Sequence, residues 1–395
     1  MTFDLARARR ETPGIAHVVH FNNAGCSLAP QPVVDAMLAH LQLEAQIGGY
    51  EAHDCQRDAT ERPYAALAQL LNASSDEIAV VENATRAWDM AFYALSLKPG
   101  DRILTSKSEY CSNFIAFLHR AKRDGIIIDV APSTPTGEID VPGLEERVGP
   151  RTRLIAITHV PTSGGQVNPA AEVGKVARRN GVPYLLDACQ SVGQMPVDVE
   201  EIGCDMLSGT GRKFLRGPRG IGFLYVRRSM NERLDPPFLD DHAADWFSDD
   251  DYAVRTDARK FETPECSFAA KIGLGVAVDY AMSWSMPAVA ERVRLLAETL
   301  RSRLQESGRA SIHDLGAMRC GIVTFSIPGV AADTIKVELR AQGINVTVAI
   351  AQATRLDMIP RGLERIVRAS LHYYNSENEI EVFVDAVSRI ARKAA

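Results

Sequence analysis

The segment from Lys98 to Asp205 alternates between short apolar runs and stretches with the spacing of amphipathic helices. This alternation constrains the fold more than any other feature of the chain. We expect strands and helices in turn over 101–106, 111–123, 126–131, 141–147, 154–158, 169–180 and 184–187. Strands that alternate with helices need crossover connections, which make the sheet parallel and cover both of its faces. The sequence therefore predicts an α/β fold around a mostly parallel sheet.

The length of the chain favours more than one hydrophobic core. The chain has 395 residues, and chains longer than about 250–300 residues commonly divide into domains. We expect an arm over residues 1–20, a large domain over 21–266 and a small C-terminal domain over 267–395. After a long helical region, the strands and helices of the last part follow without strict alternation, which is typical of an α+β domain.

Two segments carry weaker patterns. Residues 48–62 are polar and begin with a pair of glycines, so we expect a mobile connection before a helix over 63–72. Residues 228–262 contain three consecutive aspartates and show no clear periodicity, so we expect an irregular region there.

Composition and charge argue against several classes of protein. The formal net charge is −6, which does not indicate a nucleic-acid partner. No apolar run is long enough to span a bilayer, and the polar N-terminal stretch is unlike a signal peptide. The seven cysteines are odd in number and contain no CxxC pair, which fits reduced thiols better than disulfides or a zinc site. We expect a cytoplasmic protein with no metal site, membrane contact or nucleic-acid partner.

Polar residues follow four of the predicted strands, at 106–113, 158–166, 187–190 and 208–213. Ligands of parallel sheets bind beyond the carboxyl ends of the strands, so we expect these four segments to form one pocket. A further polar segment, 82–86, opens a predicted helix. The free N–H groups of a first helical turn suit a phosphate, although Asn or Thr before a helix is usually only a cap.

Lys213 stands in a run of small residues and precedes a predicted strand over 221–226. A lysine with little bulk beside it can approach a planar ligand closely, and burial lowers its pKa enough to free the amine for Schiff-base chemistry. A solvated loop lysine is the ordinary alternative. We interpret Lys213 as the residue that carries pyridoxal 5′-phosphate (PLP), because the other groups that this cofactor needs are also present.

PLP chemistry needs an acid that keeps the pyridine nitrogen protonated and a flat group against the ring. Asp187 ends an apolar run, and a carboxylate at a buried strand end needs a donor or a cation as its partner. Gln190 can reach the ring hydroxyl and Tyr110 can stack on the ring. Arg368 can clamp a substrate carboxylate with two parallel hydrogen bonds. Each of these residues alone also has a plain structural interpretation, as a cap, a core-edge side chain or a surface charge.

Seven short motifs, each present once, follow one another along the chain: FNNAG (21–25), ENAT (82–85), SEYCSN (108–113), THVPTSGGQVNP (158–169), LLDACQSVG (185–193), TGRKFLRGPRGIGFLYV (210–226) and RASLHYYNSENEI (368–380). In this order and spacing they resemble the class V aminotransferase and cysteine desulfurase family of fold-type I PLP enzymes over nearly the whole chain. The resemblance implies a homodimer with its two sites at the subunit interface. It also implies a phosphate contact from the second subunit, which we place near Thr263 and Ser267.

The resemblance further implies roles for individual residues. Lys213 would hold the cofactor, Asp187 would pair with the pyridine nitrogen, and Gln190 would bond the ring hydroxyl. The residues that would bind the phosphate are Ala84, Thr85 and Thr210. The substrate, an amino acid, would be held by Arg368 and Asn23.

Three positions depart from the desulfurase pattern. Tyr110 stands where desulfurases have a stacking histidine, and Thr162 stands near the ring hydroxyl where they often have asparagine. Arg212 stands where they have histidine before the lysine. Arginine is a fixed cation that can bind an anion but cannot relay protons as histidine does. We interpret Cys111 and Cys189 as small buried residues rather than reactive thiols.

Residues 344–367 contain no cysteine, although a desulfurase carries its persulfide cysteine in this part of the chain. The nearest cysteine upstream is Cys320. Because the nucleophile is absent from this segment, we expect a PLP-dependent lyase or aminotransferase that is not a persulfide-forming cysteine desulfurase.

For the reaction, we expect proton removal from Cα of an α-amino acid by the amine of Lys213. We favour C–S β-lyase activity on an S-substituted cysteine or its sulfoxide. TGRK (210–213) and RLDM (355–358) resemble the branch of the family with the ergothioneine-pathway sulfoxide lyase and isopenicillin N epimerase. An aminotransferase and an amino-acid epimerase stay open. A regulatory homologue that binds PLP without turnover is an alternative of another class, against which the presence of Lys213, Asp187 and Arg368 argues.

Overall fold

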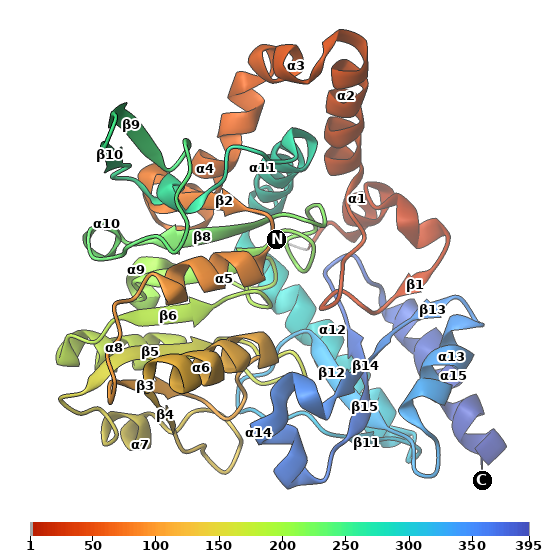
Figure 1. Cartoon of the computed structure of the whole chain (residues 1–395). Coiled ribbons are helices and arrows are strands. Elements are labelled where there is room, and N and C mark those ends of the chain that lie inside the picture. The colour runs from red at the N-terminus through yellow and green to blue at the C-terminus, as the bar shows by residue number, and fades with distance from the viewer. Residues whose placement is uncertain (1–2, 395) are drawn as a thin grey trace.

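A seven-stranded sheet lies at the centre of the larger part of the molecule (Figure 1) in the computed structural model, which describes residues 3–394. The strand order is β2-β8-β7-β6-β5-β3-β4. All neighbours pair in parallel except β8, which runs antiparallel to both β2 and β7. The predicted α/β fold with a mostly parallel sheet is confirmed. The strands are β2 (Ile78–Val81), β3 (Arg102–Thr105), β4 (Ile127–Val130), β5 (Thr152–Thr158), β6 (Tyr184–Asp187), β7 (Met206–Thr210) and β8 (Gly222–Val226).

Helices cover both faces of this sheet, which explains why its strands are continuous apolar runs. Along β6, Tyr184 and Leu186 pack on one face and Leu185 packs on the other. One face is covered by α4 (Arg57–Leu71), α8 (Ala170–Asn180) and α11 (Phe268–Met282). The opposite face is covered by α5 (Ala84–Tyr93) and α6 (Cys111–Asp124). The short helices α7 (Val141–Glu145) and α9 (Val199–Ile202) lie beside α8.

The C-terminal part is built on a second sheet, which is antiparallel and has the order β11-β12-β15-β14. Its strands are β11 (Ser311–Ile312), β12 (Ile322–Ser326), β14 (Thr347–Ile350) and β15 (Arg365–Ser370). Three helices pack with it around a core of its own: α12 (Met286–Glu306), α13 (Ala332–Arg340) and α15 (Glu377–Ala394). A mixed α+β arrangement in this part is therefore present. Figure 1 shows it to one side of the large sheet.

The start of the chain contacts this C-terminal part. After the short helix α1 (Leu5–Arg10), strand β1 (Val19–His20) pairs in parallel with β13 (Ile344–Asn345). Residues 1 and 2 of the predicted arm lie outside the described residues. The division into 1–20, 21–266 and 267–395 stays a prediction.

The expected mobile connection over 48–62 is wrong. The helices α2 (Gln31–Ile47), α3 (Gly49–Cys55) and α4 follow one another almost without interruption, with Gly48 at a φ of 100° between the first two. The side chains of α4 pack on α11, which lies about two hundred residues later in the chain. The local pattern gave no sign of this partner, because the apolar surface that buries the segment comes from elsewhere in the sequence.

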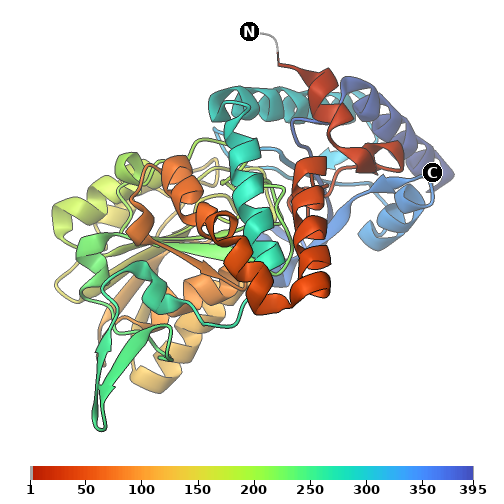
Figure 2. The same ribbon diagram turned by 90° about the horizontal axis from the view of Figure 1, so that it is seen from above.

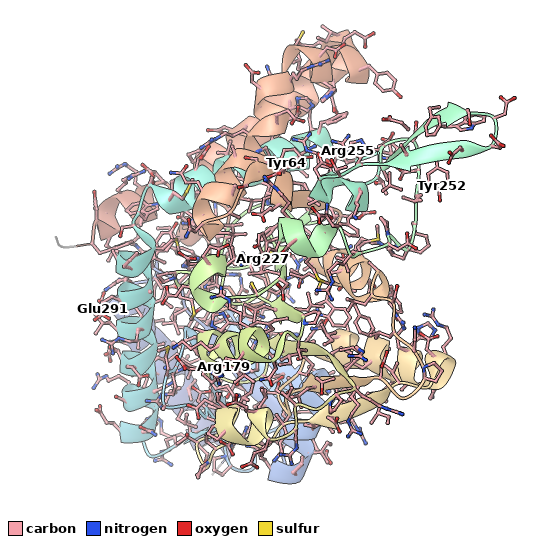
Figure 3. The ribbon with its side chains drawn as sticks, turned by 90° about the vertical axis from the view of Figure 1, so that its left-hand side faces the viewer. Tyr64, Arg179, Arg227, Tyr252, Arg255 and Glu291 are labelled. Atoms are coloured by element: carbon pink, nitrogen blue, oxygen red, sulfur yellow. The ribbon has the colours of Figure 1, made fainter. Side chains whose placement is uncertain are left out.

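The expected irregular region over 228–262 contains regular structure. After α10 (Arg228–Asn231), β9 (Ala244–Ser248) and β10 (Asp251–Val254) form an antiparallel hairpin. The hairpin projects from the body in Figures 1 and 2. Figure 3 shows Tyr252 on it, far from α12, which carries Glu291. Most of its side chains are exposed, with Trp246 at 79%, so the alternation of a half-buried strand is absent from its sequence.

The predicted helical region over 267–306 is divided into α11 and α12 by a turn at Ser283–Ser285. Within residues 3–394, none of the helices has the length and apolar character needed to cross a membrane.

Candidate active site

The carboxyl ends of β2, β3, β5, β6 and β7 meet at one edge of the large sheet, and a cavity of about 230 Å³ lies beside them. All four polar strand ends indicated by the sequence contribute to its wall. The lining residues are Asn83, Ala84, Thr85, Tyr110, Asn113, Thr158, Val160, Thr162, Asp187, Cys189, Gln190, Thr210, Arg212 and Lys213. Every residue predicted to bind the cofactor is therefore in contact with the same space.

The two residues predicted to bind the substrate do not line this cavity. Arg368, on β15, reaches its rim, where Nη1 donates to the backbone oxygen of Thr162 at 2.9 Å and to its hydroxyl at 2.6 Å. Asn23 is buried and its amide is engaged within the protein: Nδ2 donates to Ser370 O at 2.8 Å and Oδ1 accepts from Tyr374 at 2.6 Å. The substrate role of Asn23 stays a prediction.

Lys213 lies in a tight turn that follows β7. Arg216 N donates to Lys213 O at 2.9 Å, and Gly217 N donates to Gly211 O at 2.8 Å. Burial lowers the pKa of Lys213, and the positive charges of Arg212 and Arg368 act in the same direction, while Cys189 and Asp187 oppose them. Among residues 3–394, no group forms a hydrogen bond with Nζ. An amine of this kind is suited to covalent chemistry with an aldehyde.

The turn that carries Lys213 is anchored by Arg216, which is fully buried and adopts a φ of 62°. Its guanidinium donates to Leu28 O at 2.9 Å, to the Tyr373 hydroxyl at 2.7 Å and to Thr12 Oγ1 at 2.6 Å. These bonds join the turn to the N-terminal and C-terminal segments of the chain, so two distant parts of the sequence help to fix the position of Lys213.

Asp187 ends β6 with its carboxylate at the cavity. Oδ1 accepts from Cys189 N at 2.9 Å, and Oδ2 accepts from Asn113 Nδ2 at 3.0 Å. The carboxylate is therefore held from two sides, by the turn after its own strand and by the first turn of α6. A carboxylate fixed in this way is suited to a ring nitrogen that must stay protonated.

The phosphate end of the predicted site lies at the start of α5. Asn83 caps this helix, because its side chain accepts from Arg86 N at 2.9 Å. The first N–H groups of the helix, at Ala84 and Thr85, have no partner within the helix and suit an anion. Strand β8 passes close to the start of α5, because a Cβ at Gly222 would lie only 2.7 Å from Ala84 N.

These residues fit PLP. The site offers an amine without a hydrogen bond, a fixed carboxylate and a helix N-terminus. Gln190 adds a buried Oε1 that has no hydrogen-bond partner in the described part of the chain, as expected for an atom that faces a ligand. Its Nε2 donates to Ala24 O at 3.1 Å and to the Thr162 hydroxyl at 3.3 Å. Over the described range, the structure contains no group of three or more His, Cys, Asp or Glu side chains suited to a metal ion.

Asn113 and Thr158 also belong to this site; both fall within the predicted segments 106–113 and 158–166, but neither was given a role of its own. Asn113 and Thr158 both line the cavity, and both bond to Glu109, a buried carboxyl behind Asp187. Glu109 directly precedes Tyr110 at a predicted strand end. Glu109 could have been found by the argument used for Asp187, that a carboxylate after a buried apolar run needs hydrogen-bond partners.

A larger cavity, of about 750 Å³, lies elsewhere, between the α8–α9 region and α12. It contains His159, whose pKa is lowered to about 4 by burial. His159 follows Thr158 at the end of β5, but it is absent from the lining of the smaller cavity. The size of a cavity is therefore not what identifies the candidate active site here.

Comparison with known proteins gives a family. Residues 19–383 match the family described as Aminotransferase class-V. A protein named "Probable cysteine desulfurase" from Methanothermobacter thermautotrophicus is 30% identical over 391 residues, with 97% of each chain covered. The apo structure of a cysteine desulfurase from Thermococcus onnurineus NA1 has a TM-score of 0.91 at 25% identity, over 100% of this chain and 99% of that chain. A variant of the cystine C-S lyase C-DES, with glycine covalently linked to its PLP cofactor, shares the fold with a TM-score of 0.87 at 23% identity, over 96% and 98% of the two chains.

These relatives correct one expectation. The expectation that the chain is not a persulfide-forming cysteine desulfurase is wrong, because relatives that match over nearly their whole length are named cysteine desulfurases. The missing cysteine in 344–367 was weak evidence, since a thiol can reach a site from another segment. Cys189 lines the cavity, although burial raises the pKa of its thiol and so disfavours the reactive thiolate.

The matches and the geometry agree on cofactor and fold. The family match extends over nearly the whole sequence, and it includes each strand end that lines the cavity around Lys213 and Asp187. PLP is the cofactor of this enzyme. The chain belongs to the class-V aminotransferase family of fold-type I PLP-dependent enzymes.

Proposed function

We propose that this enzyme cleaves the carbon–sulfur bond of an amino acid of the cysteine type, acting as a PLP-dependent C–S lyase. The observation that carries the proposal is the pairing, in one cavity, of a buried lysine of lowered pKa with a fixed carboxylate, in a chain whose relatives are named for acting on cysteine. S-substituted cysteines and their sulfoxides are the substrates we favour. Cysteine itself belongs in the same panel, because of the names of the relatives.

The cofactor, when bound, supplies a ring that withdraws electrons from Cα of the substrate. Lys213 is the base for the Cα proton, because burial lowers the pKa of its amine and so increases the neutral fraction. Asp187 keeps the proton on the ring nitrogen. The start of α5, with Thr85 and Thr210, holds the phosphate.

Two side chains orient the substrate and the ring. Burial and the neighbouring Arg212 lower the pKa of Arg368 to about 10, so it is still a cation at neutral pH. Its Nε is buried and has no hydrogen-bond partner among residues 3–394, which leaves a donor for a substrate carboxylate. Tyr110, which lines the cavity, packs on the face of the ring.

The test is a panel of L-cysteine, S-alkyl cysteines and their sulfoxides, with pyruvate, alanine and sulfide measured together. Pyruvate from S-substituted substrates supports the lyase, and alanine with a persulfide supports a desulfurase, which also breaks the C–S bond. A keto acid formed only when an amino acceptor is supplied, or solvent deuterium at Cα without cleavage, would instead identify an aminotransferase or an epimerase. A cofactor spectrum that no amino acid perturbs would point to the regulatory homologue.

We also propose that the enzyme is a homodimer. In its support, large apolar side chains are exposed on two projecting elements, Tyr50 on α3 and Trp246 on the hairpin. Thr263 and Ser267 line a small cavity of about 40 Å³ with Lys271, and we assign this region to the phosphate contact in the second subunit. Light scattering during gel filtration should give twice the chain mass of 43.1 kDa. A particle of one chain mass at micromolar concentration contradicts the dimer.

A further inference from the structure

Glu109 is a buried carboxyl that collects four hydrogen bonds behind the candidate active site. Oε1 accepts from Thr158 Oγ1 at 2.5 Å, from Asn113 Nδ2 at 2.8 Å and from Tyr110 N at 3.0 Å. Oε2 accepts from Thr105 Oγ1 at 3.2 Å. The donors come from β3, from β5 and from the start of α6, so the side chain is held between three elements, of which β5 and α6 carry lining residues.

The amide of Asn113 joins Glu109 to Asp187. Its Nδ2 donates to Glu109 Oε1 at 2.8 Å and to Asp187 Oδ2 at 3.0 Å. An amide nitrogen has two hydrogens, and here each is directed to a different carboxyl group. The orientation of Asp187 at the cavity is therefore coupled to a second acid that does not line the cavity.

We propose that Glu109 is a positioning residue for Asp187: through Asn113 it fixes that carboxylate toward the cavity, and it places a second negative charge behind the ring nitrogen of PLP. The proposal rests on the role of Asp187 proposed above. It does not depend on which bond of the substrate is cleaved.

The charge of Glu109 changes near neutral pH. Burial raises the pKa of Glu109 to about 7, and the nearby Asp187 acts in the same direction, while the bonds from Thr158, Asn113 and Tyr110 N oppose this. The ionisable side chains that face it are Asp187 and Tyr184, both on β6. A positive charge at the ring nitrogen lowers the pKa of Glu109, because opposite charges attract. By linkage, ionised Glu109 stabilises the protonated ring nitrogen to the same extent.

The Glu109→Gln variant separates charge from hydrogen bonding. The amide oxygen of glutamine can accept the three bonds now made to Oε1, and its NH₂ can donate to Thr105, so the geometry is kept while the charge is lost. Asn113→Ser breaks the connection itself. Glu138→Gln is the matched control, because Glu138 is also buried and accepts from two threonine hydroxyls, but it lines the larger cavity and has no bond to Asn113.

The test measures the affinity of cofactor-free enzyme for 4′-deoxypyridoxine 5′-phosphate, which has the ring nitrogen and the phosphate but no aldehyde. We expect Glu109→Gln to weaken binding about tenfold at pH 8, where Glu109 is ionised, and about twofold at pH 6. Asn113→Ser should weaken binding at both pH values, because Asp187 loses its orientation. Glu138→Gln should bind as wild type does.

A loss in Glu109→Gln that is equal at pH 6 and pH 8, or no loss at either, overturns the charge role of Glu109. Unchanged affinity in Asn113→Ser overturns the connection to Asp187. Because the probe cannot form a covalent bond with Lys213 and no substrate is turned over, these results are independent of the C–S lyase assay. The absorbance of bound PLP, followed as a function of pH between pH 6 and pH 9, gives a second measurement. The midpoint of this pH titration should fall by about one pH unit in Glu109→Gln.

Discussion

Arg368 Nη1 donates to Thr162 Oγ1 at 2.6 Å, and this bond joins the C-terminal sheet to the segment that follows β5 at the rim of the candidate active site. The two residues are separated by 206 positions in the sequence. The bond fixes the guanidinium beside the cavity, although Arg368 does not line it. The C-terminal part of the chain thus holds a cation beside a cavity whose walls come from the larger part of the molecule.

We predict that Arg368→Gln lowers kcat/KM for amino-acid substrates by roughly 10- to 100-fold, mainly through KM, because a charge-assisted hydrogen bond contributes about 1.5–3 kcal/mol. Steady-state kinetics over a range of substrate concentrations measures this. Arg365→Gln is the control, since Arg365 lies on the same strand but forms an exposed ion pair with Asp333, and such pairs contribute little. Equal losses in the two variants would contradict a substrate role for Arg368.

We predict that Lys213→Met abolishes turnover, with a fall of at least about a thousandfold, and stabilises the cofactor-free protein at pH 7. Burial lowers the pKa of Lys213 in the folded state. At a pH below this pKa, the ammonium group is buried in the folded state but solvated in the unfolded state, which destabilises the fold. Stability of the wild type therefore rises as pH increases from the folded pKa toward 10.5, and the advantage of the variant shrinks over that window.

Urea unfolding of cofactor-free Lys213→Met and wild type at pH 7 and pH 9.5 measures the difference. Lys175→Met, at an exposed position on α8, is the control and should change stability little at either pH. A variant that is less stable than the wild type at pH 7 would show that Lys213 is not an unfavourable buried cation.

We predict that Glu109 makes the cofactor-free protein less stable as pH rises from 4.5 to about 7. The pKa of Glu109 is raised from 4.5 to about 7, so in this window the folded state retains a proton that the unfolded state has released. One unit corresponds to about 1.4 kcal/mol, which gives a loss of about 3 kcal/mol over the window. The free energy of unfolding of Glu109→Gln should lack this slope, and an unchanged slope would rule out Glu109 as its source.

We predict that Gly222→Ala weakens cofactor binding and costs about 2 kcal/mol or more of stability. A Cβ at this position would meet Ala84 N at 2.7 Å and Gly209 O at 2.8 Å, and these backbone atoms cannot move aside without shifting the start of α5 or strand β7. Thermal unfolding and PLP titration measure the two effects. Gly149→Ala is the control, because a Cβ there meets nothing within 4 Å; if both variants behave alike, close packing under α5 is not needed.

The large sheet was predictable because its strands are buried on both faces. Tyr184 to Asp187 has the same bounds in the prediction and in the structure, since a continuous apolar run between polar turns is a local signal. The hairpin around Trp246 was missed for the opposite reason. Its side chains are exposed, so burial leaves no pattern in its sequence.

The candidate site divides in the same way. Lys213 and Asp187 lie at predicted strand ends, and the start of α5 opens a predicted helix. In a parallel sheet, the order of strands and helices along the chain places such residues at one edge. The sequence by itself therefore determined the sheet, the strand ends and the chemical types of residue that meet there.

The tertiary structure alone decided which side chains bond. Glu109, Asn113 and Asp187 come from the loop between β3 and α6, the first turn of α6 and the end of β6. Their contact depends on the packing of α6 against the sheet. Likewise, the helix over 63–72 was predicted, but its packing on α11 was not, because that partner lies about two hundred residues later in the chain. Hydrophobic periodicity is a property of a few neighbouring residues, so the sequence shows it directly. A hydrogen bond between distant residues depends on how separate elements pack, and no local pattern contains that information.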